Sequence, residues 1–529
     1  MTYTSFLIKI FVFLFLITSY SIAQSGGNSL TYIEYHPLGN LNPYENITLR
    51  NNNLRFQSLI YQGLFKYDFN SEEYVNVLAE THRDLRNNRF RVELKRNIYW
   101  HDGQPITSQD IVSTYEFIMN EGKLPIISDR LRNSIISIEI NSATSVTFHL
   151  NDNVTVDPRF LLTQWILPHH LISTRQARQS FNRRPIGSGP YKFESLSLNG
   201  TLNLTINEKY HFKKPSIRQI RTEIMPDFDT ASLRLLSRLS DLLIDVPVNR
   251  IATIDRSPDH RLEPYQSYTI HVIAFNFNNR LLSNHRLREA ITIGFDRQTA
   301  LEQWFGGRGR VLSGPFTPGS PYFNPQIRPR THSQNHARQI LRDLGYSDIN
   351  GDGYLQQANG ERLQFRLLIN NSVSDAGMGM QNVVQQFQEQ MREIGIQIIF
   401  QYEVTDNYDQ RLMFDRDFDM ALVGWSFDPT YDISYLFHSS FIRPGGGNII
   451  SYRNNQIDNL FNQFRDSNNN VMRANYMDSI QRIIYEDIPY LFLFTIDRHA
   501  AINIRFVNTL IDPIYFFSKI EEWEIIQGL

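Results

Sequence analysis

The sequence predicts an α/β protein whose sheets, parallel or mixed, are covered by helices. The first observation is the segment 363–425, in which three apolar, strand-like runs alternate with two helical patterns. This β-α-β-α-β order favours parallel strands with helices packed on the sheet. The second observation is size. A chain of 529 residues, 41% of them hydrophobic, is long enough for two or three lobes with separate cores.

The first 23 residues have the pattern of a secretory signal peptide. Lys9 precedes an apolar run, residues 10–17, and small residues at Ser21 and Ala23 fit a cleavage site after Ala23. The run is shorter than the roughly 20 residues that span a bilayer. A buried N-terminal helix or an uncleaved anchor is the alternative interpretation. We expect residues 1–23 to be removed on export.

The composition excludes several classes of site and partner. The chain contains no cysteine, which excludes disulfides, thiolate metal sites, a cysteine nucleophile and lipid attachment through an N-terminal cysteine. Exported eukaryotic proteins of this size usually carry disulfides, so we expect a bacterial periplasmic protein that is not a lipoprotein. The net charge of −2 and the lack of a basic stripe argue against a nucleic-acid partner.

Residues 90–119 predict a strand, a turn and a helix in succession. The run 90–95 alternates apolar and charged residues, which is the period of a half-buried strand. Turn-forming residues follow at 101–105. Thr107 and Asp110 then form a capping box at the start of a helix with one apolar face.

His101 and Asp102 lie side by side in this turn, where they resemble a catalytic pair. Adjacent side chains at the end of a strand diverge, however, because successive residues point to opposite faces. The chain also lacks the G-x-S-x-G nucleophile elbow that would complete a triad. We therefore predict a structural role for both residues.

Three other motifs are incomplete versions of binding sites. His169 and His170 have no third metal ligand nearby in the sequence. The glycine-rich segment 185–194 lacks the helix and the Lys-Ser/Thr pair of a phosphate-binding loop. The segment 348–359 begins like a calcium loop, but its twelfth residue is Asn359 instead of a bidentate glutamate. We interpret all three as turns or surface residues, with calcium the less favoured alternative for the third.

The segment 363–425 divides into five elements. Its first helix has an apolar face that includes Val383, Phe387 and Met391, and Gly395 follows as the residue that ends the helix. The predicted strands and helices, in chain order, are residues 363–370, 380–395, 396–404, 406–414 and 417–425.

The residues at the end of the last of these strands are the best candidates for a binding site. In open α/β sheets, ligands bind outside the carboxyl ends of the strands. The chain supplies there an approachable glycine backbone, an aromatic wall and a carboxylate, within Gly424, Trp425, Ser426, Phe427 and Asp428. The alternative is that Trp425 belongs to the core and that Asp428–Pro429 is only a turn.

Five stretches of the chain resemble the bacterial extracellular solute-binding proteins of the oligopeptide/dipeptide family, the receptors of ABC importers. The most distinctive is LKRNIYWHDGQPITSQDIVSTYEFI, at 94–118. Four more follow in the family's order: PIGSGPYKFE, FNFNNRLLSNHRLREAITIGFDRQTAL, DMALVGWSFDP and YLFLFT. The resemblance therefore covers nearly the whole mature chain.

The resemblance implies the two-lobed periplasmic-binding-protein fold, with mixed and parallel sheets covered by helices and an extra subdomain in the first lobe. Closure of the lobes about a hinge would enclose a solute, with no catalysis, no cofactor and no metal. The expected division is 24–53, 179–270 and 489–529 for lobe I, 54–178 for its extra subdomain, and 271–488 for lobe II.

The resemblance also implies a site and partners. In peptide-binding members, the ligand main chain pairs with the protein like an added strand. A carboxylate three residues after a Gly-Trp pair binds the free amino group of the ligand, and here that residue is Asp428. The partners would be a short peptide and the membrane permease of an ABC importer, with the chain itself a monomer. The implied ligand-binding residues are Gly424, Trp425, Ser426, Asp428, Arg50 and Asn51.

Two departures from the family pattern leave other solutes open. Asp428 is followed directly by Pro429, whereas amine-binding relatives usually carry a separate Asp-Pro, so Asp428 is either the amine ligand or only a turn. Arg238 stands where relatives usually carry glycine. A saccharide or a metal chelate is the alternative solute. An exported hydrolase with paired carboxylates is the alternative class, although no motif identifies such a pair.

Overall fold

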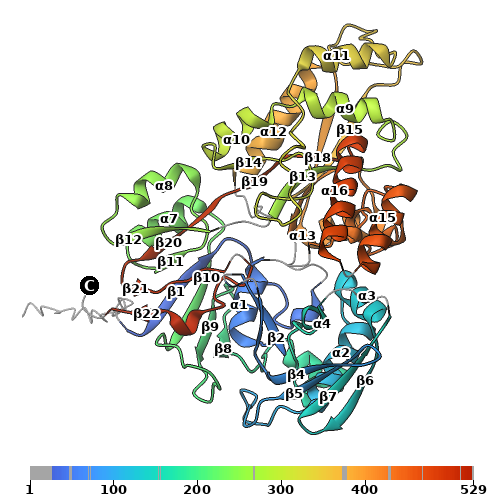
Figure 1. Ribbon diagram of the computed structural model, residues 1–529. Coiled ribbons are helices and arrows are strands. Elements are labelled where there is room, and N and C mark those ends of the chain that lie inside the picture. Colours follow the sequence, from blue (N-terminus) through green and yellow to red (C-terminus); the bar gives the residue numbers. More distant parts are fainter. Residues whose placement is uncertain are drawn as a thin grey trace, which may run out of the picture.

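The computed structural model has two lobes stacked one above the other (Figure 1). It describes residues 27–46, 51–69, 71, 73–152, 154, 157–265, 269–371, 378–426, 431–467, 469–512 and 514–526. The predicted signal peptide therefore lies outside the described residues. Within the described part of the chain, no helix is both long and apolar enough to cross a membrane.

Lobe I is built on a mixed seven-stranded sheet in the order β12-β20-β11-β1-β10-β9-β8, in which β1 runs parallel to β10 and β11. Helices α7 (Phe228–Leu236) and α8 (Val248–Asp255) cover one face. The strands are β1 (Ser29–Glu34), β8 (Tyr191–Leu196), β9 (Leu202–Ile206), β10 (Gln219–Ile224), β11 (Leu242–Leu243), β12 (His260–Tyr265) and β20 (Arg498–Asn503).

The other face of this sheet shares one continuous core with an extra subdomain. The subdomain contains the antiparallel sheet β4-β5-β7-β6 and the hairpin β2-β3. Its strands are β2 (Phe65–Asp68), β3 (Glu73–Asn76), β4 (Ala79–Leu85), β5 (Arg89–Leu94), β6 (Ile135–Ser142) and β7 (Ser145–Leu150). The helices of this part of the chain are α1 (Asn51–Ile60), α2 (Ser108–Asn120), α3 (Pro125–Ser134), α4 (Pro158–Leu161), α5 (His169–Ile172) and α6 (Arg175–Phe181).

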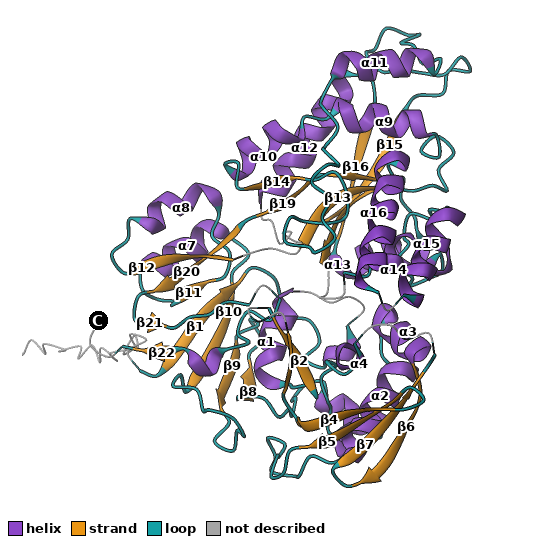
Figure 2. Cartoon of the chain, in the orientation of Figure 1, coloured by secondary structure: helices purple, strands orange, loops and turns teal. Residues whose placement is uncertain are grey.

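Lobe II is built on the sheet β16-β15-β17-β13-β18, with helices on both faces (Figure 2). Its strands are β13 (Thr269–Phe275), β15 (Gln364–Asn370), β16 (Gln397–Glu403), β17 (Met420–Ser426) and β18 (Tyr490–Phe492), beside the pair β14 (Gly309–Val311) and β19 (Phe494–Ile496). The helices are α9 (His285–Gly294), α10 (Arg297–Phe305), α11 (Gln334–Asp343), α12 (Met378–Glu393), α13 (Thr405–Asp409), α14 (Ser434–Phe437), α15 (Asn455–Asp466) and α16 (Asn470–Asp487).

The local predictions for 90–119 and 363–425 are confirmed. β5 alternates between buried and partly exposed residues, and the Asp110 carboxylate accepts a hydrogen bond from the Thr107 main-chain N–H at 2.8 Å at the start of α2. In lobe II, β15 runs parallel to both β16 and β17. The helix α12 buries its apolar face, and Gly395 follows it with a φ of +88°. The second predicted helix is α13 and a π-helical turn over Gln410–Asp415.

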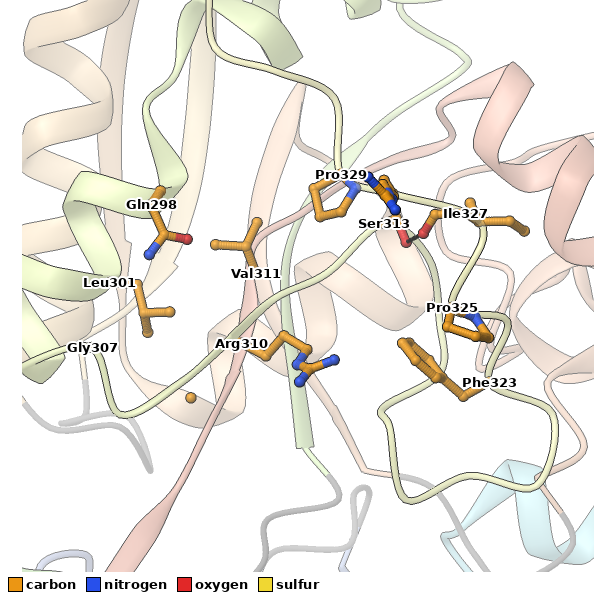
Figure 3. A pocket seen from close by; sticks show the side chains of 12 residues that line it. Gln298, Leu301, Gly307, Arg310, Val311, Ser313, Phe323, Pro325, Ile327 and Pro329 are labelled. Carbon is orange, nitrogen blue, oxygen red and sulfur yellow. Dashed lines mark hydrogen bonds between the residues drawn. The ribbon is translucent and has the colours of Figure 1, made fainter.

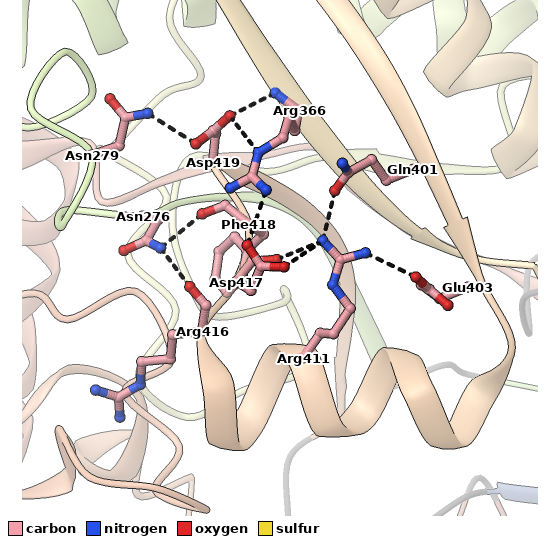
Figure 4. A network of polar contacts seen from close by, with 10 residues as sticks. All are labelled: Asn276, Asn279, Arg366, Gln401, Glu403, Arg411, Arg416, Asp417, Phe418 and Asp419. Atoms are coloured by element: carbon pink, nitrogen blue, oxygen red, sulfur yellow. Dashed lines mark hydrogen bonds and ion pairs between the residues drawn. The ribbon is translucent and has the colours of Figure 1, made fainter.

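An ion-pair network joins the beginning of β17 to β15 and β16 (Figure 4). Asp419 accepts hydrogen bonds from the main-chain N–H of Arg366 at 2.8 Å and from its guanidinium at 3.2 Å. Arg366 also pairs with Asp417 at 2.9 Å, and the hydrogen bond from this guanidinium is the main reason that the pKa of Asp417 is lowered. Arg411 bridges Asp417 and Glu403, at 3.0 and 2.9 Å. These contacts fix the parallel register at the end of β17 that is remote from the candidate site.

Two buried arginines hold the last part of the chain against lobe II. Arg297 is 5% exposed, and burial lowers its pKa to about 10, so the side chain stays charged at neutral pH. Arg288 is 3% exposed, and its guanidinium donates a hydrogen bond to the main-chain carbonyl of Ile488 at 2.9 Å. The Arg297 guanidinium donates to three main-chain carbonyls, those of Leu312 (3.0 Å), Phe492 (2.7 Å) and Arg330 (2.9 Å).

The described residues place two passages of the chain between the lobes. The first passage lies between β12, which ends at Tyr265, and β13, which begins at Thr269. The second lies at Asp497, between β19 and β20. Because β18 and β19 pair with β13 and β14, we place the return to lobe I at 497 instead of at 489. The rest of the expected division into lobes remains a proposal.

The lobes also touch on the side away from these passages. Asp129 of α3, 7% exposed, forms an ion pair with Arg443 of lobe II. Gly445 has a φ of +74°, and a Cβ placed there would lie 3.0 Å from Pro125 at the start of α3. A larger residue at 445 would therefore strain the backbone and push against the other lobe.

His101 has the predicted structural role. Its Nδ1 accepts a hydrogen bond from the Gly187 N–H, and its Nε2 lies 3.1 Å from the Gly189 carbonyl. Both glycines pack so closely on the end of α1 that an added Cβ would meet the Ile60 carbonyl. Asp102 points elsewhere and pairs with His170 at 2.8 Å. The histidine therefore fastens the glycine-rich turn to the extra subdomain, and the two adjacent side chains diverge.

We expect Arg297→Met to lower the free energy of unfolding by about 3 kcal/mol, because it removes the charged donor from two buried carbonyls and one partly buried carbonyl. Urea denaturation measures this change. The exposed Arg342 on α11 provides the matched control, and Arg342→Gln should change stability by less than about 0.5 kcal/mol. Equal effects of the two variants would contradict the role assigned to Arg297.

We expect His101 to make the fold sensitive to acid. Burial lowers the pKa of His101 from its ordinary value of 6.5 to about 4. The unfolded chain therefore binds this proton first as the pH falls, so the stabilisation present above pH 6.5 is lost between pH 6.5 and 4. Urea denaturation across this range should show a shallower pH dependence in His101→Gln than in the exposed-helix variant His336→Gln. Parallel curves for both variants and the wild type would refute the assignment.

Candidate functional site

The carboxyl end of β17 faces lobe I. β17 is antiparallel to β13, and Gly424, Trp425 and Ser426 lie opposite His271, Ile270 and Thr269, the first residues of β13. The chain enters β13 from lobe I, so the beginning of β13 lies on the side of lobe II that faces the other lobe. In Figure 2 these strand ends lie at the lower side of lobe II. The candidate site predicted from the sequence therefore lies where the two lobes meet.

One face of this strand end is small and polar. The hydroxyls of Thr269 and Ser426 are hydrogen-bonded at 2.8 Å. Thr269 and His271 are each 5% exposed, whereas Gly424 is exposed. A Cβ at Gly424 would make only ordinary contacts, 3.4 Å from Thr269 and 3.8 Å from His271. Packing therefore does not demand glycine at 424, and its absence of a side chain leaves the main chain accessible.

Trp425 points to the opposite face of the sheet. Its indole is partly buried against the core that α14, α15 and α16 cover, and it meets Tyr435 edge-on with ring centroids 6.2 Å apart. The Trp425 indole also interacts with the hydroxyl of the buried Tyr490. Both sequence interpretations of Trp425 thus apply in part, since the ring borders the core and remains partly exposed.

On the side that faces β15, the end of β17 has no strand partner among the described residues. β15 pairs with β17 at only two positions, Leu367 with Met420 and Leu368 with Ala421. The Leu422 carbonyl instead accepts a hydrogen bond from the Tyr408 hydroxyl at 2.5 Å. Within the described part of the chain, residues 423–426 therefore have no strand on this side, and an extended segment from another molecule can pair there.

The structure describes only part of the remaining predicted site residues. Asp428 and Arg50 lie outside the described residues, so their roles stay predictions. Asn51 is the first residue of α1 in lobe I. The sequence did not predict Thr269 and His271 as site residues, because their position beside Ser426 and Gly424 depends on the pairing of β13 with β17. The only local signal for them was the apolar strand pattern that begins at residue 271.

The residues of the incomplete metal and calcium motifs form hydrogen bonds within the fold. The ring Nδ1 of His169 lies 2.7 Å from the Ser113 hydroxyl. In the segment 348–359, Asp348 accepts hydrogen bonds from the main-chain N–H groups of Gly351, Asp352 and Gly353. No group of three or more metal-ligating side chains comes together among the residues that the structure describes. The three hydrogen bonds to Asp348 make the segment a tight acidic turn.

Comparison with known proteins adds a family match. The profile of the bacterial extracellular solute-binding proteins, family 5, matches residues 73–446. The oligopeptide-binding protein AppA of Bacillus subtilis is 26% identical over 486 residues, which is 88% of this chain and 86% of the relative. The nickel-binding protein NikA of Staphylococcus aureus is 22% identical over 459 residues, or 85% of this chain and 86% of the relative.

Solved structures share the fold. The structure of AppA from Bacillus subtilis in complex with a nonapeptide superposes with a TM-score of 0.86, at 24% identity, over 95% of this chain and 99% of that chain. The structure of NikZ from Campylobacter jejuni in complex with Ni(L-His) has a TM-score of 0.80, at 21% identity, over 94% and 99%. The predicted two-lobed α/β fold is confirmed.

Proposed function

Because the chain belongs to the family 5 bacterial extracellular solute-binding proteins, we propose that it is the substrate-binding component of an ABC importer and captures short peptides between its lobes. Hinge closure about the two interlobe passages encloses the peptide. The protein performs no catalysis, and its partner is the membrane permease of the importer. Export by the signal peptide of residues 1–23 delivers a monomer to the periplasm.

The observation that carries the peptide assignment is the unpaired edge of β17 at 423–426. This stretch lies at the end of β17 that is near lobe I, and on the side of β15 its main-chain groups have no strand partner among the described residues. An extended peptide satisfies such groups by adding a strand, which gives affinity independent of peptide sequence. Gly424 keeps this edge accessible, and Trp425 offers apolar surface beside it. The similarity to an oligopeptide-binding relative agrees with this assignment.

A metal chelate is the second candidate solute. The nickel-binding relative aligns over nearly as much of the chain as the oligopeptide-binding one, and Asp428 is followed directly by Pro429. If Asp428 is only a turn, the site lacks an amine ligand and a solute without a free amino group becomes the better fit.

Native mass spectrometry of the mature protein tests the assignment directly. Protein purified without denaturation should carry extra masses that fragment as short peptides, and a refolded sample should lack them. A sugar or metal-chelate mass would retain the solute-receptor function and overturn the peptide assignment. Turnover of peptides by the purified protein would overturn the receptor function itself.

We expect Asp428→Ala to weaken peptide binding at least tenfold. If the carboxylate binds the ligand ammonium in a closed cleft, its removal leaves a buried unpaired charge at a cost of about 2–5 kcal/mol. Isothermal titration calorimetry with peptides recovered from the native protein measures the change. Asp466→Ala, at an exposed position on α15, is the control. Unchanged affinity would assign Asp428 to a turn.

We also expect Gly424→Leu to weaken peptide binding without destabilising the fold. The Cβ fits without a close contact, so the thermal unfolding temperature should stay within a few degrees of the wild type. The added side chain covers the exposed main chain, so peptide affinity should fall at least tenfold. A variant that binds peptides normally would show that this strand edge is not the site.

A further inference from the structure

A hydrogen bond between the lobes spans the second passage of the chain. Gly309 of β14 lies opposite Ile496 of β19. The preceding residue, Arg308, is therefore level with Asp497, the residue at the passage itself. The Nη1 of Arg308 lies 3.2 Å from the Nε2 of His499, the second residue of β20 in lobe I. This contact joins the two lobes across the residue about which they can rotate.

An apolar contact lies beside this hydrogen bond. Val248, the first residue of α8 in lobe I, packs against the core of lobe II. A Cβ placed at Gly306, where α10 ends, would lie 3.3 Å from Val248. Figure 3 shows the turn at Gly307 that leads from α10 into β14. We call Val248, Gly306, Arg308 and His499 the hinge cluster.

The hydrogen bond of the hinge cluster requires a neutral histidine. A guanidinium has five N–H donors and no acceptor, so the Nε2 of His499 accepts and carries no proton. Protonation removes this acceptor and places a second positive charge beside Arg308. Burial, followed by the charge of Arg308, lowers the pKa of His499 from its ordinary value of 6.5, whereas Asp497 acts in the opposite direction. Separation of the lobes weakens the first two effects, so the pKa returns toward 6.5.

The other charged groups of the neighbouring elements are directed away from His499. Pro264 lies opposite His499 on β12, and α8 contributes the apolar Val248. The charged residues next to them in sequence point to other faces and form ion pairs of their own. These pairs are Arg261–Glu263 at 2.6 Å, Arg498–Asp245 at 3.6 Å and Arg250–Asp229 at 2.5 Å. Among the described residues, Arg308 and Asp497 are thus the charges that act on this imidazole.

We propose that His499 makes closure of the lobes dependent on pH, because the hinge cluster holds the lobes together when its imidazole is neutral and releases them when it binds a proton. The inference rests on the proposed function, in which closure encloses the solute. The separated arrangement binds the proton more readily, so a fall in pH below about 6.5 shifts the population toward it. The ion pair of Asp129 with Arg443, on the other side, contains no histidine. The protein therefore captures its solute at neutral pH and releases it in acid.

The first experiment measures the distance between the lobes without any solute. The chain contains no cysteine, so two introduced cysteines can be labelled specifically with a donor and an acceptor dye that do not respond to pH. Ala143→Cys, between β6 and β7, and Asp343→Cys, on α11, are exposed positions on the two lobes. Single-molecule energy transfer on refolded, solute-free protein gives the populations of the closed and separated arrangements. Their ratio should fall by about threefold or more from pH 7.5 to pH 5.0, and a ratio that stays constant would overturn the proposal.

Three variants of the labelled protein assign the response to the hinge cluster. His499→Gln keeps an acceptor for Arg308 and carries no charge at any pH, so its ratio should not change with pH. Arg308→Gln removes the like charge, and its ratio should respond less steeply than that of the wild type. His336→Gln, at an exposed position on α11, is the matched control and should respond as the wild type does. A response of His499→Gln equal to that of the wild type would overturn the proposal. Near-UV circular dichroism verifies that each variant is folded at both pH values.

The second experiment counts the protons released when a solute binds. Peptides recovered from the native protein are titrated at pH 6.0 by calorimetry in buffers of different ionisation enthalpy. The wild type should release more protons on binding than His499→Gln does, because closure lowers the pKa of the imidazole. Equal proton release would overturn the proposal while the receptor function stands. Failure of all peptides to bind, with the pH-dependent distance retained, would refute the peptide assignment and leave the response of the hinge cluster in place.

Discussion

The hydrogen bonds of Arg297 to three main-chain carbonyls are the contact on which the interlobe surface of lobe II depends. They join α10, the chain after β14, and the strand β18 that the chain adds to this lobe just before it leaves. β18 flanks β13, and β13 in turn flanks the end of β17. A charged group is used here because main-chain carbonyls of three separate segments need a donor with several N–H groups in fixed directions, and only a guanidinium supplies one.

The two lobes are related by constraints of different strength. Two covalent passages fix one side, while the opposite side is held by the ion pair of Asp129 with Arg443 and by the close approach of Gly445 to Pro125. Asp129 also pairs with Arg132 of its own helix at 2.6 Å, so its charge stays compensated when the lobes separate. In the proposed hinge closure, a contact of this kind favours the present arrangement of the lobes without making it permanent.

Polar residues of the two lobes fall into two groups according to the partners that they have. His101 and Arg288 are fully used by main-chain groups and serve the fold. Gly424, Ser426 and Arg310 remain exposed, and their main-chain or side-chain groups are accessible to another molecule. The distinction is physical: a buried polar group without a partner costs free energy, so a fold retains accessible donors and acceptors mainly where they meet solvent or a ligand.

Local rules determined a large part of this protein. The alternation in β5, the capping box of Thr107 and Asp110, and the β-α-β-α-β order of 363–425 each involve residues close in sequence, so periodicity and capping were sufficient to predict them. The tertiary structure alone decided which residues join Gly424 and Ser426, namely Thr269 and His271, and it moved the return to lobe I from 489 to 497. These contacts join strands about 150 to 200 residues apart, where pairing depends on the packing of the whole lobe and leaves no pattern in either strand.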